Sequence, residues 1–167
     1  MFGTLYSDRP KTPKYSFPIL VRDLQISIRQ GFEITSFNGL NNYKMSLYND
    51  LKISEISILK KDPRHIASVF SFAKELDLFS GHFPGNPILP GIFQIEMVKY
   101  VLEKSYDKYL RIKSVKKTKF SALIHPGKKV CLDITINKEE NNLFNVKAIL
   151  RVEDLVAGKI NLILTEK

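Results

Sequence analysis

GHFPGNPILPGIFQIEMVKYVLEKSY, residues 81–106, is the stretch of sequence that decides the fold. Its first part, residues 81–91, contains three glycines and three prolines, which constrain the backbone to an irregular path at a local conformational cost. Its second part, from Ile92 to about Tyr106, contains neither residue type and carries apolar residues at helical spacing. These residues are Ile95, Val98, Val101 and Leu102. The stretch therefore predicts a rigid loop followed by one long helix with an apolar face.

On both sides of this stretch the apolar residues alternate as they do in β-strands. Before it, we expect a strand that holds Ile53, Ile56 and Ile58, a break at Asp62-Pro63, and a second strand over His65–Leu76. After it, we expect four strands, over 110–120, 130–136, 144–152 and 160–164, with turns at 125–127 and 138–142. Strands that meander after a single helix predict an α+β fold, an antiparallel sheet wrapped around one long central helix.

Length and composition predict one ordinary domain of 167 residues with an N-terminal extension. We expect residues 1–50 to form the extension, of unclear structure although Leu24, Ile26 and Ile28 alternate like a short strand, and residues 51–167 to form the domain. The single cysteine, Cys131, excludes an intrachain disulfide. No stretch has the apolar length of a signal peptide or a membrane span, so we expect a cytoplasmic protein without membrane insertion.

A net charge of +9 attracts polyanions, and nucleic acid is the first candidate. The basic residues are scattered singly and in pairs, such as Lys60-Lys61 and Lys116-Lys117, and no aromatic-rich basic motif of a nucleic-acid module occurs. We therefore expect no nucleic acid as a partner. An acidic protein partner would explain the charge as well as nucleic acid would. The charge could also belong to a basic protein that has no polyanionic partner.

Three residues of the deciding stretch could carry chemistry. His82 lies inside the constrained loop, and histidine exchanges protons near neutral pH. Gly91 lies just before the helix, where unpaired backbone N–H groups can stabilise a carbonyl oxygen that gains negative charge. Glu96 follows one turn later, on a face with apolar and aromatic neighbours. The alternatives are a surface histidine, a Glu96 that only pairs with Lys99, and a loop that is only a rigid turn.

Residues 81–91 resemble the signature loop of the FabA/FabZ-type 3-hydroxyacyl-[acyl-carrier-protein] dehydratases, G-H-F-P-G-x-P-[IV]-[ML]-P-G, at every defined position. In that family the catalytic histidine corresponds to His82, and the catalytic acid fourteen residues later corresponds to Glu96, a glutamate as in the FabZ type. Weaker similarity continues through Lys119-Phe120, residues 125–127 and residues 152–163. The resemblance covers roughly residues 51–167 and implies a hot-dog fold.

The sequence departs from the FabZ pattern at several positions. Tyr100 stands where the family usually has glutamine, Lys119 replaces an arginine, and residues 1–50 are unmatched. Gln94, before the acid, is similar to the dehydratases of pigment or aryl-polyene clusters. The departures indicate a divergent FabZ-like member that serves a specialised pathway.

The resemblance implies dehydration of 3-hydroxyacyl-ACP to trans-2-enoyl-ACP in fatty-acid or related polyketide and polyene biosynthesis. It implies that His82 and Glu96 act as base and acid, that the Gly91 N–H holds the thioester oxygen, and that Phe83 and Pro90 contact the substrate. No metal or cofactor is implied beyond the phosphopantetheine arm of acyl carrier protein, which carries the substrate. His65 and His125 have no comparable context, and we interpret them as structural or surface residues.

The resemblance also implies an assembly and a carrier surface. Two hot-dog subunits pair their sheets in a homodimer, or in a higher homo-oligomer of such dimers, and each site takes His82 from one chain and Glu96 from the other. Acyl carrier protein is acidic, so the net charge would steer it toward the enzyme. The candidate docking residues are Arg111, Lys116, Lys117 and Lys119.

Three other functions remain open from the sequence. A hot-dog thioesterase would use Glu96 to activate water and would release a free acid instead of an enoyl thioester. A non-catalytic or heterodimer-partner dehydratase-like protein would show no turnover when purified alone. A nucleic-acid binder would retain an oligonucleotide in a salt-sensitive way.

Overall fold

The computed structural model describes residues 47–79, 85–140 and 142–167. The expected strand around Leu24–Ile28 therefore lies outside the described residues, as do His82 and Phe83. Within the described ranges the chain forms a short helix over residues 47–54, a 3-10 turn and one long helix, together with six strands. In chain order the named elements are β1 (Glu55–Asp62), β2 (His65–Ser71), η1 (Asp77–Phe79), α3 (Gly91–Tyr106), β3 (Leu110–Phe120), β4 (Lys129–Glu140), β5 (Leu143–Val152) and β6 (Leu155–Glu166).

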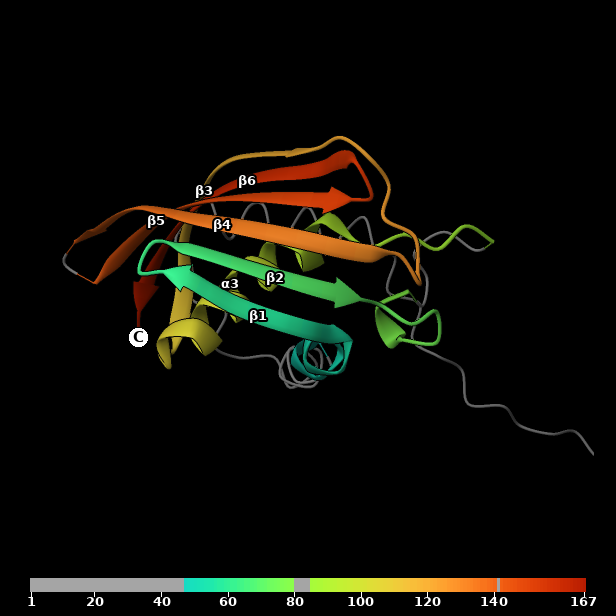
Figure 1. Ribbon diagram of the computed structural model, residues 1–167, viewed down its shortest axis with the longest axis horizontal. Coiled ribbons are helices and arrows are strands. Elements are labelled where there is room, and N and C mark those ends of the chain that lie inside the picture. The colour runs from blue at the N-terminus through green and yellow to red at the C-terminus, as the bar shows by residue number, and fades with distance from the viewer. Residues whose placement is uncertain (1–46, 80–84, 141) are drawn as a thin grey trace, which may run out of the picture.

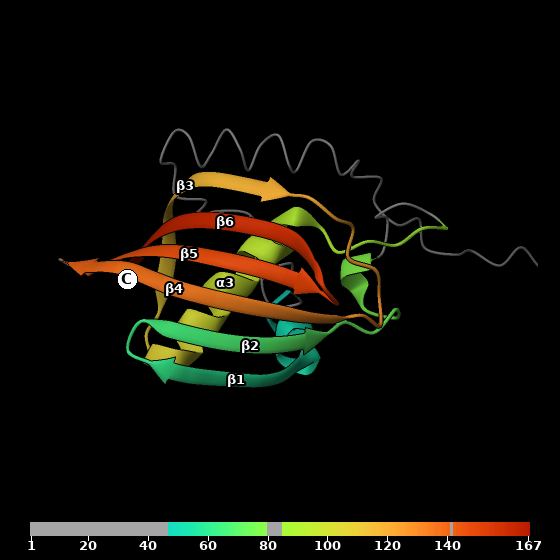
Figure 2. The ribbon, with the colours of Figure 1, turned by 45° about the horizontal axis from the view of Figure 1, so that its top comes forward.

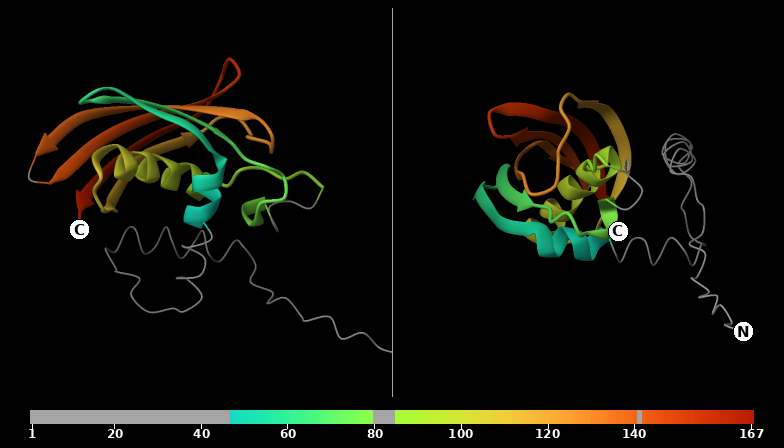
Figure 3. Two further views of the ribbon diagram at one scale, coloured as in Figure 1. Left: turned by 60° about the horizontal axis from the view of Figure 1, so that its bottom comes forward. Right: turned by 90° about the vertical axis from the view of Figure 1, so that its right-hand side faces the viewer.

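The strands form one antiparallel sheet in the order β1-β2-β4-β5-β6-β3. The sheet is curved, and α3 lies along its concave side, as Figures 1 and 2 and the left view of Figure 3 show. Hairpins join β4 to β5 and β5 to β6, whereas β3 crosses over to pair with β6 at the edge. The predicted α+β fold, with an antiparallel sheet wrapped around one long helix, is confirmed.

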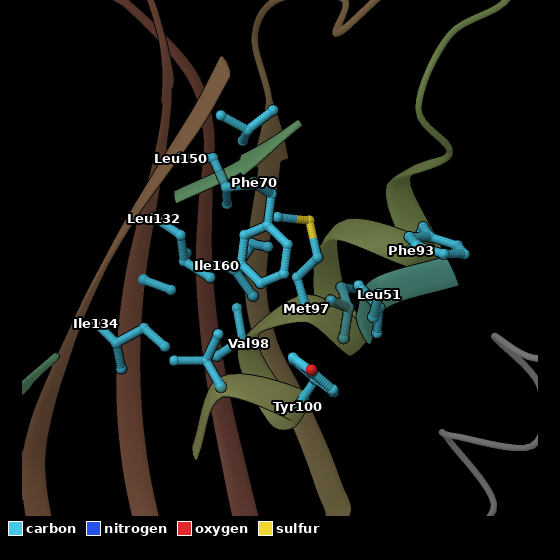
Figure 4. Close-up of a cluster of buried hydrophobic side chains, with 14 of the residues drawn as sticks. Leu51, Phe70, Phe93, Met97, Val98, Tyr100, Leu132, Ile134, Leu150 and Ile160 are labelled. Atoms are coloured by element: carbon cyan, nitrogen blue, oxygen red, sulfur yellow. The ribbon is translucent and has the colours of Figure 1, made fainter. Parts of the chain in front are cut away.

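The core lies between α3 and the inner face of the sheet (Figure 4). The helix face predicted from the sequence is the buried one, since Ile95, Val98, Val101 and Leu102 all belong to the core. Alternate residues of β4 and β5 point at this helix face and are also buried. They are Val130, Leu132, Ile134, Ile136, Phe144, Val146, Ala148, Leu150 and Val152. Strict alternation in these two strands therefore marked the inner face correctly.

The segment before β1 differs from the prediction. Residues 51–54 end a helix instead of beginning a strand, and Ile53 is exposed on it. The buried residues of this helix are Asp50, Leu51 and Ser54, which recur at helical spacing. Ile53 lies in the helix and Ile56 in β1, so the prediction that one strand holds both is wrong. The expected division at residue 50 stays a prediction, and the helix over 47–54 runs across it.

The second strand is shorter than predicted, because β2 ends at Ser71 rather than at Leu76. Phe72 continues the buried face, and the chain then turns, with the Leu76 N–H donating to the carbonyl of Ala73. The predicted break at Asp62-Pro63 is confirmed, since the Asp62 carboxylate accepts the Arg64 N–H at 2.7 Å and closes the β1–β2 turn. In the described ranges no helix is both long and apolar enough to cross a membrane.

Candidate active site

The start of α3 exposes backbone amide groups rather than charged side chains. Pro90 caps it in an extended conformation, and its carbonyl accepts the N–H groups of Phe93 at 3.0 Å and Gln94 at 3.2 Å. The N–H groups of Gly91 and Ile92 have no acceptor in the part of the chain that the structure describes. Unpaired amides at a helix N-terminus carry the positive end of the helix dipole. They can therefore stabilise an oxygen atom that gains negative charge.

Close packing against β3 explains the glycine at this position. The Phe120 ring, at the end of β3, lies so near Gly91 that a Cβ atom there would be 2.5 Å from Phe120 Cε2. Gly91 is not among the described glycines with positive φ, which are Gly85 and Gly127. The glycine is therefore required by the approach of the ring and not by the backbone angle.

The segment that leads into the helix is anchored to the segment that follows β3. The Leu89 N–H donates to the Ile124 carbonyl at 2.7 Å, and His125 Nδ1 lies 3.2 Å from the Pro87 carbonyl. The expected structural role of His125 agrees with this contact. His65 lies at the start of β2, where its Nδ1 is 2.8 Å from an Asp62 oxygen on an exposed turn.

Glu96 lies one turn into α3, and its side chain is 27% exposed. Its Oε2 is 3.4 Å from Lys99 Nζ, so the contact that the sequence offered as an alternative reading does form. Lys99 Nζ is also 3.4 Å from Glu103 Oε2, and the lysine is therefore shared between two carboxylates. Partly exposed ion pairs of this kind are weak. The contact involves Oε2 of Glu96.

The structure brings three of the predicted site residues to one end of the helix. Pro90 and Gly91 begin α3, and Glu96 follows roughly 7.5 Å further along the axis, at about 1.5 Å per residue. His82 and Phe83, the remaining two, lie outside the described residues. In the described ranges, no group of three histidine, cysteine, aspartate or glutamate residues could hold a metal ion.

Tyr100 has a role that the sequence analysis missed. The residue is buried, and its hydroxyl group donates to Glu55 Oε2 at 2.6 Å. Lys104 Nζ holds the same carboxylate at 2.8 and 2.9 Å. Burial, followed by the hydrogen bond to Glu55, raises the pKa of Tyr100. The tyrosine therefore joins α3 to the start of β1, and only its position in the apolar pattern of the helix could have indicated burial.

The predicted carrier-docking residues all lie on β3, at the edge of the sheet, but not at one place. Lys119 precedes Phe120, so its backbone lies near the start of α3, but its side chain points to the opposite face of the strand from the Phe120 ring. Lys117 points to the same side of the strand, and Lys119 pairs in register with Lys159 of β6. Arg111 is roughly 26 Å from Lys119 along the strand at about 3.3 Å per residue. Lys117, Lys119 and Lys159 are thus basic residues at this end of the sheet, on the face opposite Phe120, and the sequence analysis did not identify Lys159.

Comparisons with known proteins agree with the fold. A family profile described as "ApeI-like: ApeI dehydratase" matches residues 59–158, which include both His82 and Glu96 and span more than half of the chain. The 3-hydroxyacyl-[acyl-carrier-protein] dehydratase FabZ of Lactobacillus helveticus is 34% identical over 88 residues, 48% of this chain and 60% of that protein. FabZ of Ligilactobacillus salivarius is 33% identical over 84 residues, 46% of this chain and 60% of that protein. The chain thus spans about three fifths of the length of these relatives.

Solved structures show the same fold at low sequence identity. The structure titled "The Dehydratase Heterocomplex ApeI:P from Xenorhabdus doucetiae" matches with a TM-score of 0.59 and 24% identity, over 66% of this chain and 96% of that chain. Protein af1124 from Archaeoglobus fulgidus matches with a TM-score of 0.53 and 11% identity, over 90% of this chain and 96% of that chain. These likenesses and the antiparallel sheet around α3 show the hot-dog fold, and the profile match over residues 59–158 shows that the chain belongs to the ApeI-like dehydratases, a FabZ-like family.

Proposed function

We propose that this protein dehydrates 3-hydroxyacyl groups carried on acyl carrier protein to trans-2-enoyl groups, in the cytoplasm and without a metal or redox cofactor. The observation that carries the proposal is the start of α3. There, the amides of Gly91 and Ile92, which have no acceptor among the described residues, precede Glu96, directly after a loop that matches the dehydratase signature around His82. The substrate would serve fatty-acid biosynthesis or a related polyketide or polyene pathway.

Each site residue has one role in the reaction, and together the proton transfers balance. His82 removes the proton from Cα, and Glu96 donates a proton to the departing hydroxyl group, so that one water leaves and a carbon–carbon double bond forms. The Gly91 N–H donates to the thioester oxygen, which gains enolate character as the Cα proton leaves. Proton transfer from His82 back to Glu96, directly or through water, resets the pair. Phe83 and Pro90 line the path of the acyl group and the phosphopantetheine arm.

The assembly that we propose is a homodimer, or a larger homo-oligomer of dimers, with His82 and Glu96 of each site on different chains. A second candidate is a non-catalytic or heterodimer-partner role. One observation favours it: the similar structure from Xenorhabdus doucetiae is titled a dehydratase heterocomplex. A third candidate, the hot-dog thioesterase, differs by its product.

The experiment that tests the proposal is incubation of the purified chain with a panel of 3-hydroxyacyl carrier proteins, with mass detection of the loss of one water. Loss of water supports the dehydratase, release of free acid supports the thioesterase, and no reaction with any acyl chain supports the partner role. His82→Ala and Glu96→Gln should each reduce turnover by about 10²–10⁴-fold.

Matched controls separate catalysis from general damage. Glu103→Gln removes the other carboxylate that pairs with Lys99, and its amide oxygen can still accept the Leu110 N–H. His65→Ala removes an exposed histidine at the β1–β2 turn. Both controls should keep wild-type turnover. Mixed dimers of His82→Ala and Glu96→Gln chains should recover part of the activity, because one of their two sites carries neither change.

The basic end of β3 is the proposed carrier dock, and ionic strength tests it. Near 1 M salt the screening length falls to about 3 Å, so kcat/KM for carrier-bound substrate should fall, while kcat/KM for a short pantetheine thioester should stay nearly constant. Lys117→Glu with Lys119→Glu should have the same selective effect. Lys52→Glu with Lys61→Glu, an equal charge change at exposed positions in the helix before β1 and in β1, the opposite edge strand, should not. Equal responses of both substrates would exclude this dock.

A further inference from the structure

Gln94 is a buried polar residue on the apolar face of α3. Its side chain is 3% exposed, and its Nε2 donates to the Leu89 carbonyl at 3.3 Å. A carbonyl oxygen can only accept, so the amide nitrogen of Gln94 must be the atom that faces Leu89. The hydrogen bond therefore links the first turn of α3 back to the residue before Pro90.

Leu89 is held from two directions. Its N–H donates to the Ile124 carbonyl at 2.7 Å, and its carbonyl accepts from Gln94. Pro90 and Gly91 follow immediately, and proline restricts the backbone between the held residue and the helix. The position of Leu89 thus determines where the unpaired N–H groups of Gly91 and Ile92 lie.

The Gln94 amide oxygen accepts no hydrogen bond from the described residues. This atom, Oε1, is buried. It lies against β6, where a Cβ atom on Gly158 would be 3.1 Å from it and 3.5 Å from the Phe120 ring. A buried acceptor without a donor destabilises a fold, and an apolar side chain of similar size would avoid that cost. Residues that reduce stability in this way are expected at functional sites.

We propose that Gln94 is a positioning residue for the dehydration reaction. It fixes the Leu89 carbonyl, and through it the Gly91 and Ile92 N–H groups that would receive the thioester oxygen, without contacting the substrate itself. The inference rests on the proposed function and adds a residue to the site that the signature loop does not include.

The test replaces Gln94 by leucine and by methionine, which keep the side chain apolar and of similar size but remove the donor. Turnover (kcat) should fall by about 10- to 100-fold, in line with the sensitivity of catalysis to small displacements. KM should change little, because an interaction made mainly in the transition state is lost. The melting temperature should change little, because the unpaired Gln94 oxygen is gone while the Leu89 carbonyl loses its donor. Met97→Leu, an apolar exchange at a fully buried position on the same helix, should leave kcat unchanged.

Amide hydrogen exchange gives a readout that does not depend on activity. The segment over residues 85–95 should exchange faster in both Gln94 variants, with the β4–β5 hairpin unchanged. Unchanged exchange in this segment, unchanged kcat, or a fall of kcat in step with the melting temperature would each overturn the positioning role. If the wild-type chain dehydrates no substrate, the proposed function fails, and hydrogen exchange alone still decides whether Gln94 holds this segment.

Discussion

Replacing Gly91 by alanine tests whether the approach of Phe120 sets the position of the helix start. The new Cβ atom would lie 2.5 Å from Phe120 Cε2 and 3.0 Å from its Cδ2 and Cζ. Carbon atoms pack best at about 3.5–4.0 Å, so the ring or the helix start must move by roughly 1 Å. The variant therefore strains the contact between α3 and β3 without removing any hydrogen bond.

The size of the effect follows from two opposing contributions. Overpacking costs typically about 1–3 kcal/mol, and the lower half of that range applies here because the Phe120 ring is 43% exposed and can swing outward. Alanine improves helix propensity over glycine by at most about 1 kcal/mol. The free energy of unfolding should therefore fall by roughly 0.5–1.5 kcal/mol, and turnover should fall as well because the Gly91 N–H is displaced.

A double-mutant cycle with Phe120→Ala isolates the contact. Phe120→Ala alone should destabilise the protein because it removes apolar packing, but adding Gly91→Ala to that background should cost nothing or stabilise the helix. Denaturant unfolding of the four proteins measures the coupling, which should be about 1 kcal/mol or more. If the two changes are additive within about 0.3–0.5 kcal/mol, the ring does not constrain Gly91 and the reasoning is refuted.

Two further predictions concern titratable groups away from the site. Tyr100→Phe should cost about 1.5–3 kcal/mol at neutral pH, because a hydrogen bond to the charged Glu55 is lost. Since the pKa of Tyr100 is raised above its ordinary value of 10.0, the folded state keeps the proton that the unfolded state loses. Stability should therefore fall as pH rises above about 10 in the wild type, and unfolding curves of Tyr100→Phe should show a smaller decline. Burial also raises the pKa of Asp50, although the Leu78 N–H opposes the shift, so the ionised carboxylate weakens the fold near neutral pH. Asp50→Asn should raise the melting temperature near pH 7, and this advantage should shrink as acid protonates Asp50; an advantage that does not depend on pH would contradict the argument.

The sequence by itself determined most of the local elements and the family. A stretch without proline or glycine, with apolar residues at helical spacing, predicted α3 almost to its ends, and strict alternation predicted the inner faces of β4 and β5. These signals are local, because the period of a helix or a strand is written in consecutive residues. The resemblance of residues 81–91 to the dehydratase loop predicted the family, which the profile match confirmed.

Only the tertiary structure decided the contacts between distant segments. The sequence did not reveal that Phe120 packs on Gly91, that Tyr100 binds Glu55, or that Gln94 holds Leu89. The prediction also placed residues 51–54 in a strand. Their buried residues follow a helical pattern that begins before residue 51. Strand order and side-chain partners depend on which surfaces meet when the sheet curves around the helix. No local period encodes that choice, since the same alternating strand can pair with any neighbour that covers its apolar face.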